Sequence, residues 1–394
     1  MSGYQRDAVL AFAVAAVAAW AFTPVTGRLA RALGAVDQPS DRGLSDRPTP
    51  RLGGIAILAA GVLAGLIWLP AQSGLVHPHP VFTGILGGAV IITVVGAIDD
   101  LVDLNPLLKL IGQTGAALVP VLSGVAVQNF TAPFLGHVDL GGAADPVTVL
   151  ALIVVMNVVN FSDGVDGLAA GVCAIVAIAF AVIAFDLGKN YAAILAALTA
   201  GASLGFLSHN FYPASVFMGD SGSNLLGLVM GCVAIEGTVK TPAVVAVGFP
   251  LVLLAVPFLD TTFVILKRLK YRRPVYRADD EHFHHRLARI GFSQRRTAVY
   301  IYVWTLLLAG LALAMRFVPY SDHHGHFKLA GSIALAAIGL VVAAASVYLV
   351  YVLEILKFRR RLRRLQPETA EHEIDAELTR RLETGEFDAI RAGR

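Results

Sequence analysis

Apolar runs long enough to cross a lipid bilayer recur along the chain, and they constrain its fold more than any other feature. A helix needs about 20 apolar residues to span the hydrocarbon core. About eleven candidate spans lie near 8–27, 53–69, 81–98, 107–124, 146–159, 167–186, 191–208, 224–240, 242–266, 297–316 and 328–356. The ninth contains Pro250 and Pro257, so we expect that helix to be kinked or broken. The sequence therefore predicts an all-α polytopic membrane protein.

The amino-acid composition supports this class and excludes others. The 394 residues are 56% hydrophobic and 15% charged, whereas soluble domains average about 45–50% apolar and about 25% charged residues. A formal net charge of +3 is too small to indicate a nucleic-acid binder, so no nucleic-acid partner is expected. The two cysteines, Cys173 and Cys232, both lie in apolar runs, which excludes a disulfide framework or a zinc site.

The distribution of Lys and Arg predicts the orientation in the membrane. If odd-numbered spans run inward, 26 of the 31 basic residues fall on the cytoplasmic side, as the positive-inside rule requires. The N-terminus is then outside and the C-terminus cytoplasmic. We expect residues 1–356 to form an integral membrane domain and residues 357–394 a basic, amphipathic cytoplasmic tail that contacts membrane lipids.

Four polar clusters fall on the side predicted to be cytoplasmic. They are Asp99, Asp100 and Asp103; Asn157, Asn160, Asp163 and Asp166; Phe217-Met218-Gly219-Asp220-Ser221-Gly222-Ser223; and His282, His284, His285 and Arg286. Each cluster alone is compatible with helix caps or turns, which favour Asn, Asp and Ser. Carboxylates near a membrane are costly without partners, so their gathering on one face indicates a functional site.

The residue types in these clusters suit phosphoryl transfer. Carboxylate and amide oxygens favour Mg²⁺, with Mn²⁺ as an alternative, and the basic, His-rich cluster suits a diphosphate or a sugar. The sequence has neither a P-loop motif nor Gly-x-Gly-x-x-Gly, so a nucleotide is not expected to be held in those ways. An intramembrane Mg²⁺-dependent prenyltransferase is an alternative enzyme, and an ion-coupled transporter is an alternative outside enzymes.

Over roughly residues 8–356 these motifs resemble the polyprenyl-phosphate N-acetylhexosamine-1-phosphate transferases. The matching segments are Pro50-Arg51-Leu52-Gly53-Gly54, the Asp99 cluster, residues 157–168, Phe217-Met218-Gly219-Asp220 and His282-x-His284-His285-Arg286. The His-x-His-His spacing resembles the branch that uses UDP-N-acetylglucosamine (UDP-GlcNAc). The branch that uses a muramoyl-pentapeptide donor, with three contiguous His, is the alternative. The family often shows Arg-Lys-x-His where this chain has Arg42-Gly43 and then Ser45, so we expect that substrate contact to be either absent or supplied by Arg47 or Arg51.

The resemblance implies transfer of GlcNAc-1-phosphate from UDP-GlcNAc to a polyprenyl phosphate (undecaprenyl or decaprenyl), with release of UMP. This reaction is the first step of a cell-envelope glycan. It also implies a multi-pass protein of the plasma or inner membrane, a homodimer, with its active site facing the cytoplasm.

The resemblance further implies roles for individual residues. Asp220 and Asn160 hold Mg²⁺, and Asp99 and Asp100 are the catalytic residues that position or deprotonate the lipid phosphate. The residues expected to bind substrate are Arg51, Asp103, Asp163, Asp166, His282, His284, His285 and Arg286.

Overall fold

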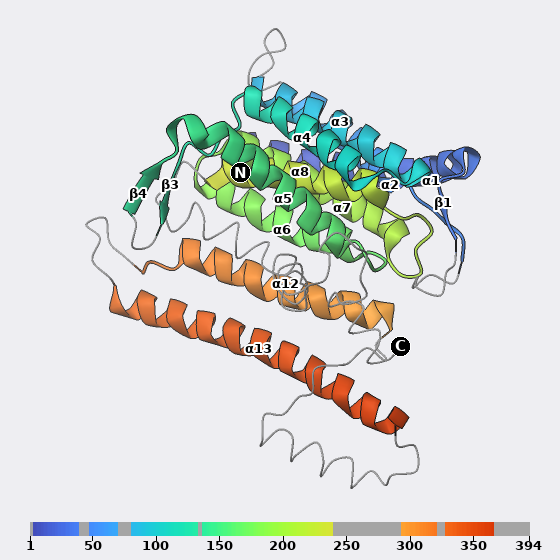
Figure 1. Cartoon of the computed structure of the whole chain (residues 1–394). Helices are drawn as coiled ribbons and strands as arrows, with labels where there is room; N and C mark the ends of the chain where they lie inside the picture. Colours follow the sequence, from blue (N-terminus) through green and yellow to red (C-terminus); the bar gives the residue numbers. More distant parts are fainter. Residues whose placement is uncertain are drawn as a thin grey trace.

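The computed structural model describes residues 3–38, 47–69, 80–132, 136–238, 293–320 and 328–365 of the chain. Within these ranges the protein is almost entirely α-helical, which confirms the predicted class (Figure 1). The exceptions are two short antiparallel hairpins and a 3₁₀ turn. They are β1 (Val36–Asp37) with β2 (Thr49–Pro50), β3 (Asn129–Ala132) with β4 (Gly136–Asp139), and η2 (Gly141–Ala143).

Ten α-helices lie in the described part of the chain, and each has a counterpart among the predicted spans. They are α1 (Gly3–Leu33), α2 (Gly53–Trp68), α3 (Pro80–Val102), α4 (Pro106–Leu122), α5 (Ala144–Ser162), α6 (Leu168–Asp186), α7 (Asn190–Asn210), α8 (Gly219–Thr238), α12 (Gln294–Phe317) and α13 (Leu329–Leu365). Seven helical segments in these ranges are long and apolar enough to cross a membrane, and α2 and α4 are shorter apolar helices. The predicted broken span near 242–266 lies outside the described residues.

Helices α1 to α8 form one bundle in which α6, α7 and α8 are central. Helix α7 packs against α1 and α6, whereas α8 contacts α2, α3, α5, α6 and α7. In the most apolar windows of α6 and α7, 78% of the residues are buried, against 6% in α13. The buried faces of α6 and α7 are rich in alanine, and small residues let helix backbones approach closely within a membrane.

Two glycines let α2 and α3 touch the first turn of α8. A Cβ atom on Gly54 of α2 would lie 2.2 Å from the backbone nitrogen of Gly222. A Cβ atom on Gly96 of α3 would lie 2.5 Å from the carbonyl carbon of Asp220. Only glycine fits at such distances, so these two positions fix the place where α8 begins.

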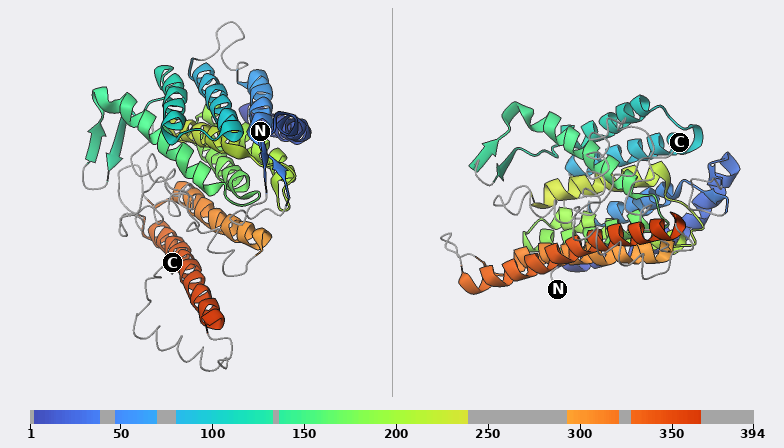
Figure 2. Two further views of the ribbon diagram at one scale, coloured as in Figure 1. Left: turned by 45° about the vertical axis from the view of Figure 1, so that its right-hand side comes forward. Right: turned by 60° about the horizontal axis from the view of Figure 1, so that its bottom comes forward.

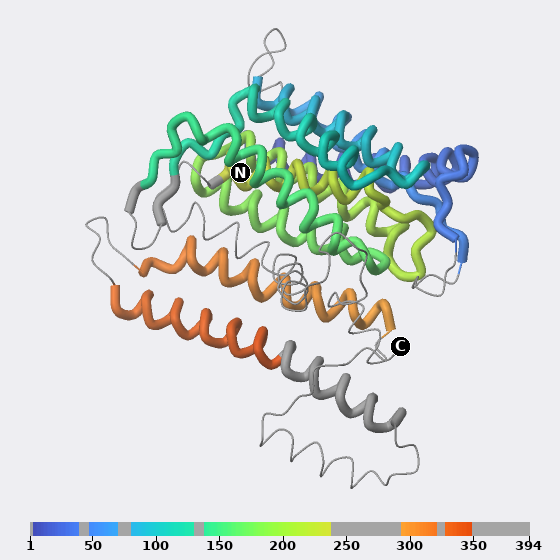
Figure 3. Tube along the Cα trace, in the orientation of Figure 1, coloured from blue at the N-terminus to red at the C-terminus, as the bar shows by residue number. Residues whose placement is uncertain are grey.

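Helices α12 and α13 lie side by side along one flank of the bundle (Figures 1 and 2). Helix α12 packs against α6 on one side and α13 on the other. Figure 3 shows α12 and the first part of α13 as neighbouring tubes. Helix α13 continues as one helix past residue 356 to Leu365 (Figure 1). The first basic residues of the predicted tail therefore extend the last helix, and the remainder of the tail lies outside the described residues.

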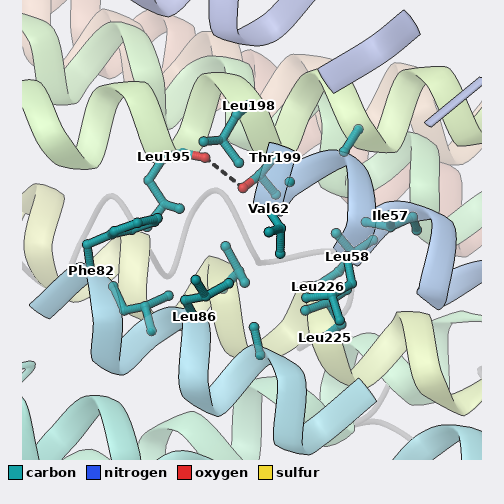
Figure 4. A pocket seen from close by; sticks show the side chains of 15 residues that line it. Ile57, Leu58, Val62, Phe82, Leu86, Leu195, Leu198, Thr199, Leu225 and Leu226 are labelled. Atoms are coloured by element: carbon teal, nitrogen blue, oxygen red, sulfur yellow. Dashed lines mark hydrogen bonds between the residues drawn. The ribbon is translucent and has the colours of Figure 1, made fainter. Parts of the chain in front are cut away.

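An apolar pocket lies between α2, α3, α7 and α8 (Figure 4). Its labelled side chains are aliphatic or aromatic except for Thr199, whose hydroxyl donates a hydrogen bond of 2.6 Å to the carbonyl of Leu195. Among the described residues that line it, no side chain is charged. This pocket is therefore not suited to a diphosphate, and the polar chemistry must be sought elsewhere.

Candidate active site

The polar residues predicted from the sequence meet where four helix termini come together. The C-terminal ends of α3 and α5 approach the N-terminal ends of α4 and α8, because α3 packs against both α4 and α8, and α5 packs against α8. This arrangement brings Asp99 and Asp100 of α3 to Asn160 of α5 and Asp220 of α8. Four residues expected from three separate motifs therefore lie in one cluster.

Asp100 binds the backbone at the start of α8. Its Oδ1 accepts a hydrogen bond of 2.9 Å from the Asp220 N–H, and its Oδ2 accepts one of 3.2 Å from the Ser221 N–H. The first N–H groups of a helix have no partner within the helix, and the positive end of its dipole favours an anion. Gly219 has φ +69°, and a Cβ there would lie 2.4 Å from the Asp100 carboxylate. Asp100 thus acts as an N-terminal cap that α3 supplies to α8.

Lys109 of α4 links two carboxylates, and the sequence prediction missed it. Its Nζ lies 2.9 Å from Asp99 Oδ2 and also forms an ion pair with Asp220. The side chains of Lys109 and Asp99 are 21% and 7% exposed, so water screens this contact weakly. Lys109 is the only Lys or Arg between Arg51 and Lys189. That isolation in the sequence was a signal that could have found it.

Asn160 and Ser223 complete the surroundings of Asp220. Asn160 Nδ2 donates to Asp220 Oδ1 at 2.6 Å and to Ser223 Oγ at 2.8 Å. The site thus gathers carboxylate, amide and hydroxyl groups on two facing helices.

A chain of amides lies behind this cluster. Asn157 Nδ2 donates to Gln113 Oε1 at 3.0 Å, and Gln113 Nε2 donates to Asn224 Oδ1 at 2.8 Å. Asn224 Nδ2 in turn donates to the carbonyl of Asp220 at 2.9 Å. Gln113 and Asn224 are buried, so satisfied hydrogen bonds are required there. The chain ties α4, α5 and α8 together next to Asp220.

Asp163 and Asp166 lie in the short loop between α5 and α6. Burial is the main cause that raises the pKa of Asp163 well above its ordinary value, followed by the nearby carboxylates of Asp220, Asp100 and Asp166. Burial also raises the pKa of Asp166, although the 2.9 Å hydrogen bond that Ala214 N–H donates to its Oδ2 acts in the opposite direction. The loop therefore adds two further acidic side chains to the cluster.

Arg51 lies beside the segment that leads into α8. The Phe217 N–H donates to the Pro50 carbonyl at 2.8 Å, and the Gly53 N–H donates to the Phe217 carbonyl at 3.0 Å. The Arg51 guanidinium pairs with Asp37 across the β1–β2 hairpin. Its charge also lowers the pKa of Asp163, against the larger effect of burial.

The remaining predicted residues are not part of this cluster as described. Asp103 follows α3 with φ +54°, and its side chain is exposed. The structure gives that side chain no hydrogen bond or ion pair within the described ranges. His282, His284, His285 and Arg286 lie outside the described residues.

The cluster fits a hard divalent cation that is shared with a substrate. Mg²⁺ is usually held by one or two protein carboxylates, with water and substrate phosphates completing its ligands. Asp220, Asn160 and Ser223 carry oxygen atoms that can serve as metal ligands. Among the described residues, no group of three His, Cys, Asp or Glu side chains is arranged to hold a metal ion. These few oxygen ligands are compatible with a metal that is held jointly with a phosphate group.

Known proteins resemble this chain across most of its length. Residues 82–238, which contain the whole Asp99–Asp220 cluster, match the family model of glycosyl transferase family 4. A probable undecaprenyl-phosphate N-acetylglucosaminyl 1-phosphate transferase of Bacillus subtilis is 37% identical over 309 residues, which are 78% of this chain and 85% of that protein. A decaprenyl-phosphate N-acetylglucosaminephosphotransferase of Mycobacterium leprae is 36% identical over 341 residues, 80% of this chain and 85% of that protein. A phospho-N-acetylmuramoyl-pentapeptide-transferase of Desulforudis audaxviator is 33% identical over 302 residues, 69% of this chain and 86% of that protein.

Proposed function

Because the chain belongs to the polyprenyl-phosphate N-acetylglucosamine-1-phosphate transferases of glycosyl transferase family 4, we propose that it transfers GlcNAc-1-phosphate from UDP-GlcNAc to a polyprenyl phosphate. An oxygen of the lipid phosphate attacks the β-phosphorus of UDP-GlcNAc. The bond from that phosphorus to the bridging oxygen breaks, and UMP leaves with that oxygen. The products are polyprenyl-diphospho-GlcNAc and UMP.

The observation that carries this proposal is the set of contacts made by Asp220. Its backbone is held by Asp100, and its carboxylate contacts Lys109 and Asn160. The Lys109 ammonium suits a diphosphate directly, and the Asp220 carboxylate suits one through a divalent cation, because catalysis of phosphoryl transfer is mainly positioning and electrostatic stabilisation.

Asp220 and Asn160 are the residues that would hold Mg²⁺ or Mn²⁺ in this site. The metal supplies Lewis-acid stabilisation of charge on the phosphate oxygens when bound. The 2.6 Å contact from Asn160 Nδ2 to Asp220 Oδ1 places the two side chains together. A carboxylate oxygen and an amide oxygen are both ligands that a hard cation accepts, which supports the assignment.

Lys109 and Asp99 act on the acceptor in this proposal. A phosphate monoester has a second pKa near 6, so the lipid phosphate is largely dianionic at cytoplasmic pH and needs little help from a base. Lys109 attracts that dianion, and Asp99, 2.9 Å from Lys109 Nζ, fixes the position of the ammonium group. Asp99 therefore contributes mainly through geometry.

The polyprenyl tail runs between α4 and α5. A surface groove there, lined mostly by apolar residues, includes Leu118, Val121, Val149 and Ile153. Helix α4 also carries Lys109, nine residues before Leu118, which corresponds to about 14 Å along a helix. The phosphate then meets Lys109 while the chain extends toward the other membrane face.

The site faces the cytoplasm of a plasma-membrane protein in this proposal. The support is the charge distribution, because 26 of the 31 Lys and Arg residues fall on one side if odd-numbered spans run inward. A homodimer is proposed as the functional form, and cross-linking in membranes tests it.

A panel of donors tests the reaction. Purified full-length protein is incubated with polyprenyl phosphate and UDP-GlcNAc, UDP-N-acetylgalactosamine, UDP-glucose or UDP-MurNAc-pentapeptide, with Mg²⁺, Mn²⁺ or EDTA. We expect UMP and lipid product from UDP-GlcNAc, with loss of both in EDTA. Transfer of an unmodified hexose or of the muramoyl-pentapeptide, with none of GlcNAc, would overturn the substrate assignment.

Asp220→Ala tests the metal assignment. We expect kcat to fall at least about 100-fold, while the protein keeps its elution volume and unfolding transition. Asp139→Ala, at an exposed aspartate near the β3–β4 hairpin, is the matched control and should retain activity. Turnover near that of the wild type in Asp220→Ala would remove the metal assignment.

A further inference from the structure

Two loops lie beside the active site, one carrying Asp163 and Asp166 and the other leading into Asp220, and the buried side chain of Asn210 joins them. Residues 163–167 connect α5 to α6, and residues 211–218 connect α7 to α8. The Gly167 N–H donates to Asn210 Oδ1 at 3.0 Å, while Asn210 Nδ2 donates to the Val216 carbonyl at 3.0 Å. Asn210 is 2% exposed, so its amide is occupied by the backbone of the two loops.

Asp166 forms a second link between the same loops. Its Oδ2 accepts a hydrogen bond of 2.9 Å from the Ala214 N–H. Asn210 and Asp166 therefore couple the position of residues 163–167 to that of residues 211–218. The second segment leads directly into Asp220.

Helix α12 holds both loops from outside the α1–α8 bundle. The hydroxyl of Tyr302 donates a hydrogen bond of 2.6 Å to the Gly167 carbonyl. In the first turn of α12, Arg295 Nε donates to the Tyr212 carbonyl at 3.0 Å, and its guanidinium lies 5.9 Å from the centre of the Tyr212 ring. One short stretch of α12 thus contacts both loops.

The packing around Tyr302 leaves its ring little freedom. A Cβ atom at Gly171 of α6 would lie 2.3 Å from the Tyr302 hydroxyl oxygen, so the ring lies directly on the α6 backbone. Gly167 has φ +78°, a conformation that favours glycine, and its N–H and carbonyl are bound by Asn210 and Tyr302 respectively. The peptide groups on either side of Gly167 are held by two different helices.

We propose that Tyr302 is a positioning residue for binding of the nucleotide-sugar donor. Its hydrogen bond fixes Gly167, and with it the loop that carries Asp163 and Asp166. Through Asn210 it also fixes the segment that precedes Asp220. The inference rests on the proposed function in taking the donor to be a nucleoside-diphosphate sugar, and it adds a role for a helix that has no residue in the Asp99–Asp220 cluster.

Tyr302→Phe removes only the hydroxyl and keeps the ring against Gly171. The net value of one hydrogen bond corresponds to a change of about 2- to 12-fold in an equilibrium constant. We expect KM for UDP-GlcNAc to rise by about that factor, with KM for polyprenyl phosphate unchanged and kcat within about 2-fold of the wild type. KM for polyprenyl phosphate is unaffected because the contacts proposed for that lipid lie on α4 and α5.

Two further variants make this test specific. Tyr348→Phe, at an exposed tyrosine of α13, is the matched control and should leave all three constants unchanged. Gly171→Ala pushes the Tyr302 ring aside while keeping its hydroxyl, so it should raise the donor KM as Tyr302→Phe does. A donor KM equal to that of the wild type in Tyr302→Phe, or an equal rise in both KM values, would overturn the proposal.

Hydrogen exchange separates this inference from the proposed function. In the substrate-free protein, Tyr302→Phe should speed amide exchange in peptides covering 163–168 and 211–218, but not in peptides from α4. If the wild type transfers no sugar yet this pattern appears, the proposed function fails and the link from α12 stands. Unchanged exchange in both loops refutes the link whatever the substrate is.

Discussion

Replacing Asp100 with Asn distinguishes two roles that the sequence leaves open for this carboxylate. If Asp100 is a base, Asn removes its chemistry and leaves the fold intact. If it caps α8, Asn changes the fold itself, because the two backbone donors of Asp220 and Ser221 then face one amide oxygen and one NH₂ group. One backbone N–H would lose its acceptor and meet a second donor.

The size of the effect follows from these contacts. A hydrogen bond to a charged group contributes about 1.5–3 kcal/mol, and a negative charge at a helix N-terminus contributes about 0.3–1 kcal/mol, or up to about 2 when partly buried. Losing one such bond and the charge therefore destabilises the folded protein by about 2–4 kcal/mol. At about 2–4 °C per kcal/mol, as for domains of 150–250 residues, the unfolding midpoint should fall by roughly 4–16 °C.

The assay is thermal unfolding of detergent-purified Asp100→Asn beside the pH dependence of its kcat. We expect a lowered midpoint and a loss of turnover at every pH, because Asp220 is displaced along with the start of α8. Asp99→Asn is the comparison, since Asp99 receives its backbone hydrogen bond from Leu104 and not from α8. An Asp100→Asn protein with the midpoint of the wild type, and with activity that recovers at high pH, would refute the capping role and favour base catalysis.

Two further predictions concern Lys109 and Asp166. Lys109→Gln leaves two carboxylates without their cation, so steady-state kinetics should show kcat/KM lowered by at least about 100-fold. Lys109→Arg restores the positive charge and should recover part of that loss. A Gln variant with the kcat/KM of the wild type contradicts the role proposed for this residue. Burial raises the pKa of Asp166 in the folded state, so its contribution to stability falls as pH rises from the unfolded pKa, about 4, toward the raised value. Asp166→Asn keeps an acceptor for the Ala214 N–H but does not titrate. In EDTA, the unfolding midpoint of this variant should therefore match that of the wild type at pH 4 and exceed it at pH 8. A constant difference between the two midpoints across that range contradicts the prediction.

The sequence predicted the helices well because apolar runs and membrane thickness are both local quantities. The fifth span illustrates where that information ends. Apolarity predicts a helix over 146–159, whereas α5 continues to Ser162. Its last turn is polar because Asn160 contacts Asp220, and Ser162 bonds back to the Val158 carbonyl at 2.9 Å. The apolar run therefore ends before the helix ends, and hydropathy alone underestimates the length of α5.

The sequence predicted the acidic residues of the candidate site but not its lysine, Lys109. Asp99, Asn160 and Asp220 stand in dense polar motifs, which are unusual in a chain this apolar. Lys109 stands alone in the sequence, 111 residues from Asp220. Its role arises only when α3, α4 and α8 pack together, and no periodicity within α4 encodes that contact.

The place of Asp100 shows how a local conflict in a sequence can reveal a long-range contact. An acidic residue in the last turn of a helix is unfavourable, since that end of the helix dipole is negative. Helix α3 nevertheless ends with Asp99 and Asp100 and has no basic residue in its last turn. The conflict is resolved because the positive N-terminus of α8, 120 residues further on, meets Asp100, and Lys109 meets Asp99. Each carboxylate is stabilised by a helix other than its own, so the charges that disfavour α3 by itself also specify how α3, α4 and α8 assemble around Asp220.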